Sequence, residues 1–131
     1  MSNSMRTPLG QVRGLGSARD GVGHFIKQRG SAIVLAFLTP WLLINVLCAT
    51  RGVDVDARYA HAVDWIGNPV NGLLAILTVG AALYHMRLGL QVVIEDYIHA
   101  HGTKLALLLL NTVASVGLFA AAAFAVLKLA I

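Results

Sequence analysis

The sequence predicts an all-α membrane protein with three transmembrane helices, and three observations support this. The 131 residues are 57% hydrophobic and only 12% charged, with a mean hydropathy of +0.73, whereas a soluble domain carries about a quarter charged residues. Three stretches contain no formal charge: 30–50, 65–86 and 105–127. Each provides the roughly 20 residues that a helix needs to cross about 30 Å of hydrocarbon. Backbone groups in lipid must be hydrogen-bonded within their own segment, which favours helices over other structures there.

We expect these helices at about 28–50, 69–97 and 104–129. In the first helix, Pro40 removes one backbone hydrogen bond and is expected to bend the helix. The second helix is expected to begin at Pro69, because proline suits the first turn of a helix. The stretch between them, 51–68, is expected to be a loop that places Trp65 at the membrane interface.

Basic residues gather before the first helix and predict its orientation. They are Arg6, Arg13, Arg19, Lys27 and Arg29. Segments rich in Lys and Arg stay in the cytoplasm, so we expect a cytoplasmic amino terminus and a periplasmic carboxyl terminus. Residues 1–22 are expected to form a flexible cytoplasmic arm, and residues 23–131 a membrane anchor domain. The net charge of +4 is therefore interpreted as a topology signal, and the expected partner is the lipid bilayer rather than nucleic acid.

The polar residues of the apolar region concentrate at one end of the second helix, between residues 83 and 102. Within this stretch, His85 is placed inside the membrane, where an ionisable side chain is costly unless it is paired and usually marks a site. One interpretation is a neutral imidazole that bonds to another helix; the other is an axial haem ligand. Gly89 lies one turn along the same face. It leaves room either for a flat macrocycle or for close helix packing.

The remaining histidines are expected outside the apolar cores. They are His24, His61, His99 and His101. A low-spin haem with two histidine ligands would therefore need its second ligand from another polypeptide. If haem is bound, the chain is part of a hetero-oligomer or a symmetric dimer.

The end of the second helix combines a phenol with carboxylates at the level of the headgroups. Tyr97 suits an interface anchor, but a hydroxyl beside Asp96 can also donate a hydrogen bond to a quinone carbonyl and take part in a proton path. Arg29 belongs to the same level of the membrane. It can extend to lipid phosphates, or pair with a haem propionate or with the carboxylate of Asp96.

The chain lacks the patterns of a soluble catalytic centre. It contains no nucleotide-binding fingerprint, and its single cysteine excludes a cysteine cluster for iron–sulfur. We therefore expect no dehydrogenase active site in this chain.

The stretch "HMRLGLQVVIEDY" resembles the signature of the small hydrophobic membrane anchor subunit of succinate dehydrogenase, respiratory complex II. That signature has a His, a Gly four residues later, and Asp-Tyr eleven and twelve residues after the His; here these are His85, Gly89, Asp96 and Tyr97. The segment 21–35 is similar to the lead-in to the family's first helix. Three helices with the expected orientation agree with this family.

The resemblance implies roles for individual residues. His85 would be one axial ligand of haem b, and the large cytochrome b anchor subunit would supply the other. Tyr97 would hydrogen-bond ubiquinone, supported by Asp96, and Arg29 would lie near the haem propionates or the quinone. The implied partners also include an iron–sulfur subunit and a flavoprotein subunit. Electrons would pass from succinate through flavin and iron–sulfur clusters to quinone, and this chain would be a non-catalytic anchor of that enzyme.

Other functions fit the same residues. An anchor of fumarate reductase differs in the direction of the reaction and in the quinone. A purely structural small membrane protein would use His85 only to pack helices, and a small transporter would need more polar residues than this chain has. Without an evident transit peptide, the bacterial inner membrane is favoured over the mitochondrial inner membrane.

Overall fold

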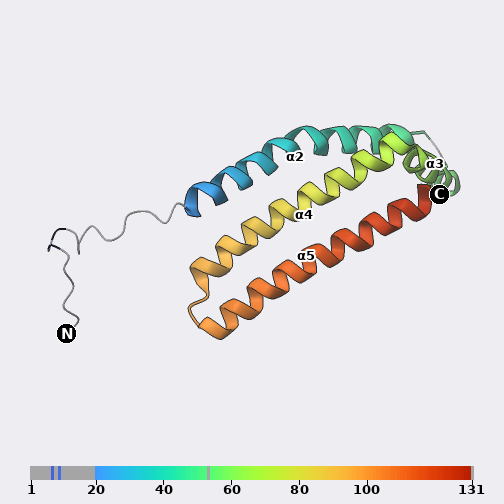
Figure 1. The fold of residues 1–131 in the computed structure, drawn as a ribbon. Coiled ribbons are helices and arrows are strands. Elements are labelled where there is room, and N and C mark those ends of the chain that lie inside the picture. Colours follow the sequence, from blue (N-terminus) through green and yellow to red (C-terminus); the bar gives the residue numbers. More distant parts are fainter. Residues whose placement is uncertain (1–6, 8, 10–19, 53, 131) are drawn as a thin grey trace.

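The computed structural model describes residues 7, 9, 20–52 and 54–130. This part of the chain contains four helices and no strand: α2 (Asp20–Thr50), α3 (Val55–Gly67), α4 (Pro69–Tyr97) and α5 (His101–Ala130) (Figure 1). Three segments of these helices are long and apolar enough to cross a membrane: Gly21–Ala49, Pro69–Tyr97 and His101–Leu129. The predicted all-α fold with three membrane-spanning helices is confirmed.

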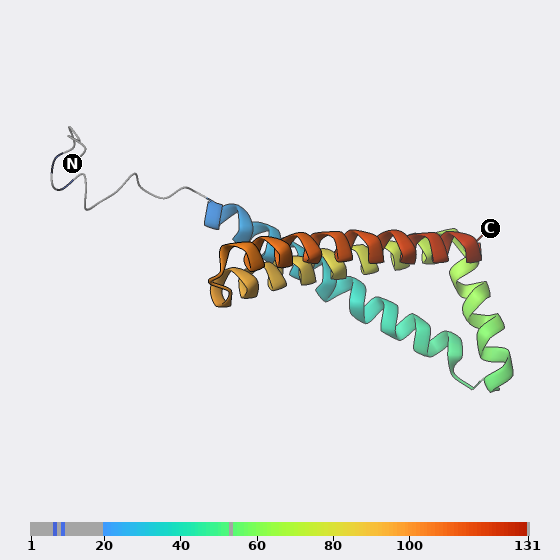
Figure 2. The same ribbon diagram turned by 90° about the horizontal axis from the view of Figure 1, so that it is seen from below.

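The helix α4 lies between the other two long helices. It packs against α2 on one side and α5 on the other, while the described residues of α2 and α5 make no contact with each other. The second half of α2 diverges from α4, and α3 runs across the gap that this leaves (Figure 2). The helix α2 is curved along its length (Figure 1), as expected for a helix that contains Pro40.

The prediction of a loop over 51–68 was wrong, because most of this stretch forms α3. Its polar residues suggested a loop, but they lie on a short helix without buried residues, with Asp56 in its first turn. Trp65 on α3 packs against Trp41 on α2, with ring centroids 6.0 Å apart. The rings of Trp41 and Trp65 therefore connect α3 to α2, the helix that precedes it.

The start of α4 was predicted correctly, and its local chemistry explains why. Asn68 is the N-cap, and its side-chain oxygen accepts a hydrogen bond from the Val70 backbone N–H at 3.0 Å. Pro69 follows in the first turn, where no backbone donor is needed.

The expected ends of the first two helices, near residues 50 and 97, agree with the structure, whereas the first and third helices begin earlier than expected. The first helix begins at Asp20 rather than near residue 28, so its first turns carry His24 and Lys27. The third begins at His101 rather than near residue 104. Apart from Thr7 and Leu9, residues 1–19 of the expected arm lie outside the described residues. Charged residues mark the end of an apolar run, but a helix can continue past it into the headgroup region.

Small and polar residues rather than large apolar ones form the interior of the bundle. The buried residues of α4 are Gly72, Ala75, Thr78 and Leu88, and those of α5 are Asn111 and Ser115. Most large apolar side chains are exposed, as a chain surrounded by lipid or by other subunits requires. In lipid, burying large side chains gives little driving force, so helices associate through close approach and hydrogen bonds.

Candidate functional site

His85 lies on the side of α4 that faces α2, where it meets a serine. Its Nδ1 is 2.9 Å from the Ser31 hydroxyl, and this hydroxyl also donates to the Gln28 carbonyl at 3.0 Å. A serine hydroxyl has one hydrogen, so when it donates to Gln28 it can only accept from His85. Nδ1 then carries the imidazole proton, and Nε2 keeps a free lone pair. A neutral imidazole in this tautomer is a metal ligand through Nε2.

A cavity of about 420 Å³ opens beside this imidazole on one flank of α2. Its lining residues are Phe25, Gln28, Arg29, Ala32 and His85. Arg29 lies over the Phe25 ring, 5.4 Å from its centroid, which holds the guanidinium at the cavity by a cation–π contact. The structure thus brings together two predicted site residues that are far apart in the sequence.

Gly89 lies one turn from His85 on the same face of α4. A Cβ atom built at this glycine would meet no atom of the described residues within 4 Å, apart from its chain neighbours and the backbone of its own helix. Packing of α4 within this chain therefore does not explain the glycine. The open space is available to a flat ligand or to a helix of another subunit.

Asp96 and Tyr97 end α4, about 16 Å along the helix axis from His85 by the helical rise. Both are exposed, and Tyr97 exposes 75% of its surface. They do not line the cavity that holds His85 and Arg29. The predicted residues therefore separate into two places, an intramembrane cavity and an exposed helix end.

A metal held entirely by side chains of this chain finds no support. Among the described residues there is no group of three or more His, Cys, Asp or Glu side chains placed to hold a metal ion. An axial haem ligand makes a smaller demand, since a single imidazole from each of two chains is enough.

Sequence analysis did not identify Ser31 as a site residue. In the sequence it is only a serine near the start of the first uncharged run. Its burial is visible only in the structure. Its partner lies 54 positions away. Only the packing of α2 against α4 shows that Ser31 sets the orientation of His85.

The fold and the site define a small multi-pass membrane protein with polar residues at one end of its central helix. The chain belongs to the family of the succinate dehydrogenase/fumarate reductase transmembrane subunit, whose model matches residues 3–119. The family indicated by the spacing of His85 and Tyr97 is thereby confirmed.

Several relatives carry the name of an anchor subunit. The succinate dehydrogenase hydrophobic membrane anchor subunit of Rickettsia bellii is 36% identical over 99 residues, which cover 75% of this chain and 74% of the relative. The subunit of the same name from Paracoccus denitrificans is 29% identical over 123 residues, covering 94% and 91%. The succinate dehydrogenase membrane anchor subunit of Reclinomonas americana is 31% identical over 87 residues, covering 66% and 71%.

Proposed function

We propose that this chain is a membrane anchor subunit of a succinate–quinone oxidoreductase, in which it supplies one axial ligand of haem b and part of the ubiquinone site. The observation that carries the proposal is the pairing of His85 with Ser31, which leaves Nε2 free beside a cavity lined by Arg29. The names of the relatives support the assignment to succinate dehydrogenase.

The residues around His85 fit a haem shared between two chains. The Nε2 of His85 would hold the iron together with a histidine of the large cytochrome b anchor subunit. The Arg29 guanidinium would pair with a propionate, a charge-assisted contact. The open space at Gly89 would admit the edge of the macrocycle. A bound haem of this kind would accept and release single electrons between the two chains.

The quinone contact is assigned to the exposed end of α4. There the Tyr97 hydroxyl would donate a hydrogen bond to a ubiquinone carbonyl, and the neighbouring carboxylate of Asp96 would support it. Reduction of ubiquinone to the quinol takes up two electrons and two protons, and a phenol beside a carboxylate can pass a proton to the carbonyl oxygen. The other walls of the site would come from the large anchor and iron–sulfur subunits, and the flavoprotein subunit would oxidise succinate.

The orientation in the membrane follows from the distribution of charge. The basic residues of the amino-terminal segment include Lys27 and Arg29 at the start of α2, the same end of the bundle at which α4 ends and α5 begins. This end would face the cytoplasm, and α3 with the carboxyl terminus would face the periplasm. Rickettsia and Paracoccus are bacteria, so their anchor subunits favour the bacterial inner membrane.

The variant His85→Ala tests the haem assignment. In the complex purified through this chain, we expect the reduced b-type haem spectrum to be lost or strongly shifted, because the iron loses one ligand. The control is His61→Ala, which removes an exposed imidazole on α3. A wild-type spectrum in the His85 variant would reduce the proposal to a structural anchor without a haem ligand.

The variant Tyr97→Phe tests the quinone contact. We expect ubiquinone reductase activity to fall roughly tenfold or more, because a positioned proton donor contributes at least this much. Succinate oxidation with an artificial acceptor should stay unchanged. Tyr59→Phe is a matched control, since Tyr59 is 74% exposed on α3. Equal loss of both activities would indicate failed assembly rather than a quinone contact.

A fumarate reductase anchor is the second candidate, because the matching family includes both enzymes. The two differ in direction, so the rates of succinate oxidation by ubiquinone and of fumarate reduction by menaquinol, measured on the same complex, distinguish them.

A further inference from the structure

A second hollow lies on the other flank of α2, away from the cavity at His85. Since α2 and α5 each pack on α4 but do not contact each other within the described residues, α4 forms the floor of a groove between them. Three cavities of about 340, 260 and 380 Å³ follow this floor, and Tyr84 lines all three. We call these adjoining hollows together the α2–α5 groove. It shares no lining residue with the cavity at His85.

One end of the α2–α5 groove is basic. Lys27, Arg87 and His24 line it together with Gln91, and no carboxylate among the described side chains lines it. Glu95 accepts a hydrogen bond from Gln91 at 2.8 Å but is not among the lining residues. The groove therefore presents cationic groups on two helices without an acidic partner in its wall.

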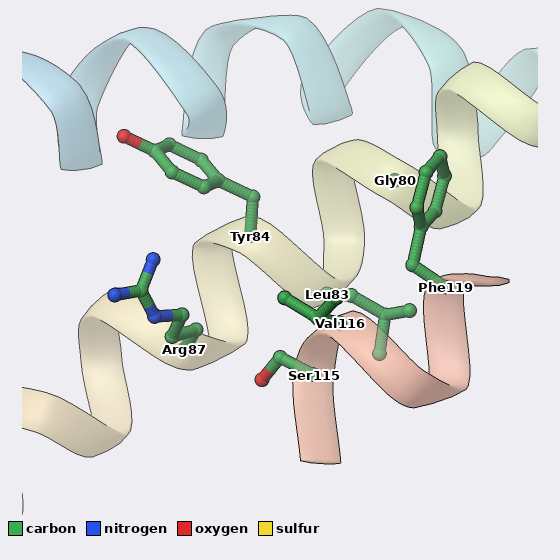
Figure 3. Close-up of a pocket in the computed structure, with 7 residues that line it drawn as sticks. All are labelled: Gly80, Leu83, Tyr84, Arg87, Ser115, Val116 and Phe119. Atoms are coloured by element: carbon green, nitrogen blue, oxygen red, sulfur yellow. The ribbon is translucent and has the colours of Figure 1, made fainter. Parts of the chain in front are cut away.

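Two hydrogen bonds to α5 hold Arg87 at the wall of the basic end of the groove. Its Nε donates to the Thr112 hydroxyl at 3.2 Å, and its backbone carbonyl accepts from the Asn111 amide at 2.9 Å. Figure 3 shows the terminal nitrogens of the guanidinium on the side away from α5. The contact with Thr112 thus uses one N–H and leaves the outer part of the guanidinium directed at the groove.

His24 adds an unsatisfied polar atom. Its Nε2 is buried and has no hydrogen-bond partner among the residues that the structure describes. An unpaired buried polar group costs about 1–3 kcal/mol, so a ligand that pairs with this nitrogen would recover part of that cost.

The rest of the groove is apolar and narrow. The Phe119 ring covers Gly80, where an added Cβ would come within 2.9 Å of the ring (Figure 3). Leu38 and Leu77 continue the apolar wall toward the other end of the bundle. Between the two parts, the Tyr84 phenol extends from α4 toward α2 (Figure 3). The groove therefore has a cationic head and an apolar tail.

We propose that the α2–α5 groove binds one anionic phospholipid, with the phosphate between Lys27 and Arg87 and an acyl chain along Gly80 and Phe119. Charge complementarity selects this occupant, because a phosphodiester carries the negative charge that the basic end lacks. Basic pockets between membrane helices bind anionic headgroups in this way. A quinone has a similar shape but a neutral head, so it does not use the two cations. The site is independent of the haem and quinone assignments.

The test uses the complex purified in mild detergent through this chain, then depleted of lipid. Phosphatidylglycerol or phosphatidylcholine is added back, and native mass spectrometry measures the lipid retained per complex. We expect phosphatidylglycerol to be retained preferentially. Lys27→Gln should weaken its retention roughly fivefold, the contribution of one cation at a membrane surface. The control is Lys104→Gln, because Lys104 donates to the Glu95 carbonyl and does not line the groove.

A second variant tests the apolar part without changing the charge. Val116 lines the groove and is 60% exposed, so Val116→Phe should fill the tail region, leave the fold intact and lower phosphatidylglycerol retention. Equal retention of the two lipids, or equal effects of Lys27→Gln and Lys104→Gln, would overturn the proposal. So would loss of subunit assembly with unchanged lipid retention in Val116→Phe, since that result would place a partner helix in the groove.

Discussion

The helix α4 packs against a neighbour on each side, and its two interfaces are built differently. Toward α5, side-chain hydrogen bonds cross the interface, from Asn111 to the Arg87 carbonyl and from Arg87 to Thr112. Toward α2, a side-chain hydrogen bond joins Ser31 and His85, and a cavity opens on each flank of α2. The α4–α5 interface is closed around these hydrogen bonds and opens at the hollow beside Gly80 and Phe119, whereas the α2–α4 interface is open on both flanks of α2.

We expect this difference to separate residues that affect stability from residues that affect ligand binding. Around Arg87, the α4–α5 interface pairs the Asn111 amide and the Thr112 hydroxyl within the chain. The hollow at Gly80 and Phe119 is not lined by either of these two side chains. The α2–α4 interface instead presents an imidazole nitrogen and a guanidinium to whatever fills its cavity. Substitutions in the first interface should therefore change stability, and those in the second should change ligand binding.

The largest effect on stability is expected from Gly72→Ala, where α4 meets the end of α3 and Val126 of α5. The new Cβ would come within 2.9 Å of the Ile66 carbonyl oxygen, a backbone atom that cannot easily move away. Overpacking of this kind costs about 2 kcal/mol. Thermal unfolding of the purified complex should show a lower midpoint. An unchanged midpoint would mean that the contact between α3 and α4 adjusts freely.

A smaller effect, on ligand binding alone, is expected from Ser31→Ala. Without the hydroxyl, His85 loses the acceptor that holds its Nδ1 proton, and loss of such a supporting partner lowers metal affinity roughly tenfold. Haem content after dialysis against apomyoglobin should fall, and the haem midpoint potential should shift. Ser31→Thr keeps the hydroxyl and should restore both. If Ser31→Ala lowers the unfolding midpoint and leaves haem retention and potential unchanged, the serine only packs helices.

The smallest effect is expected from Gly89→Ala, which places the same methyl group as Gly72→Ala in open space. The unfolding midpoint should stay at the wild-type value when haem is absent. Haem incorporation should decrease modestly, because the methyl group would narrow the space beside His85. A drop in stability as large as that of Gly72→Ala would show that α4 is not open on this face.

Much of the fold could be predicted from residue order because the bilayer imposes a simple requirement. Uncharged runs of membrane length must be helices, so the three spans follow from composition, and Asn68-Pro69 marks the start of α4 by local capping. The helical repeat also places His85 and Gly89 on one face. The predicted loop at 51–68 was wrong because a short polar helix carries no apolar periodicity strong enough to identify it.

The sequence by itself thus determined the membrane-spanning helices and the family, and it predicted His85 as an imidazole that binds a ligand within the membrane. The tertiary structure alone decided that Ser31 orients that imidazole, that Arg29 lines the same cavity, and that Lys27 and Arg87 meet in a separate groove. The physical reason is that local hydrophobicity and capping act within one helix. Side-chain pairing between α2, α4 and α5 instead depends on how separate helices pack against one another.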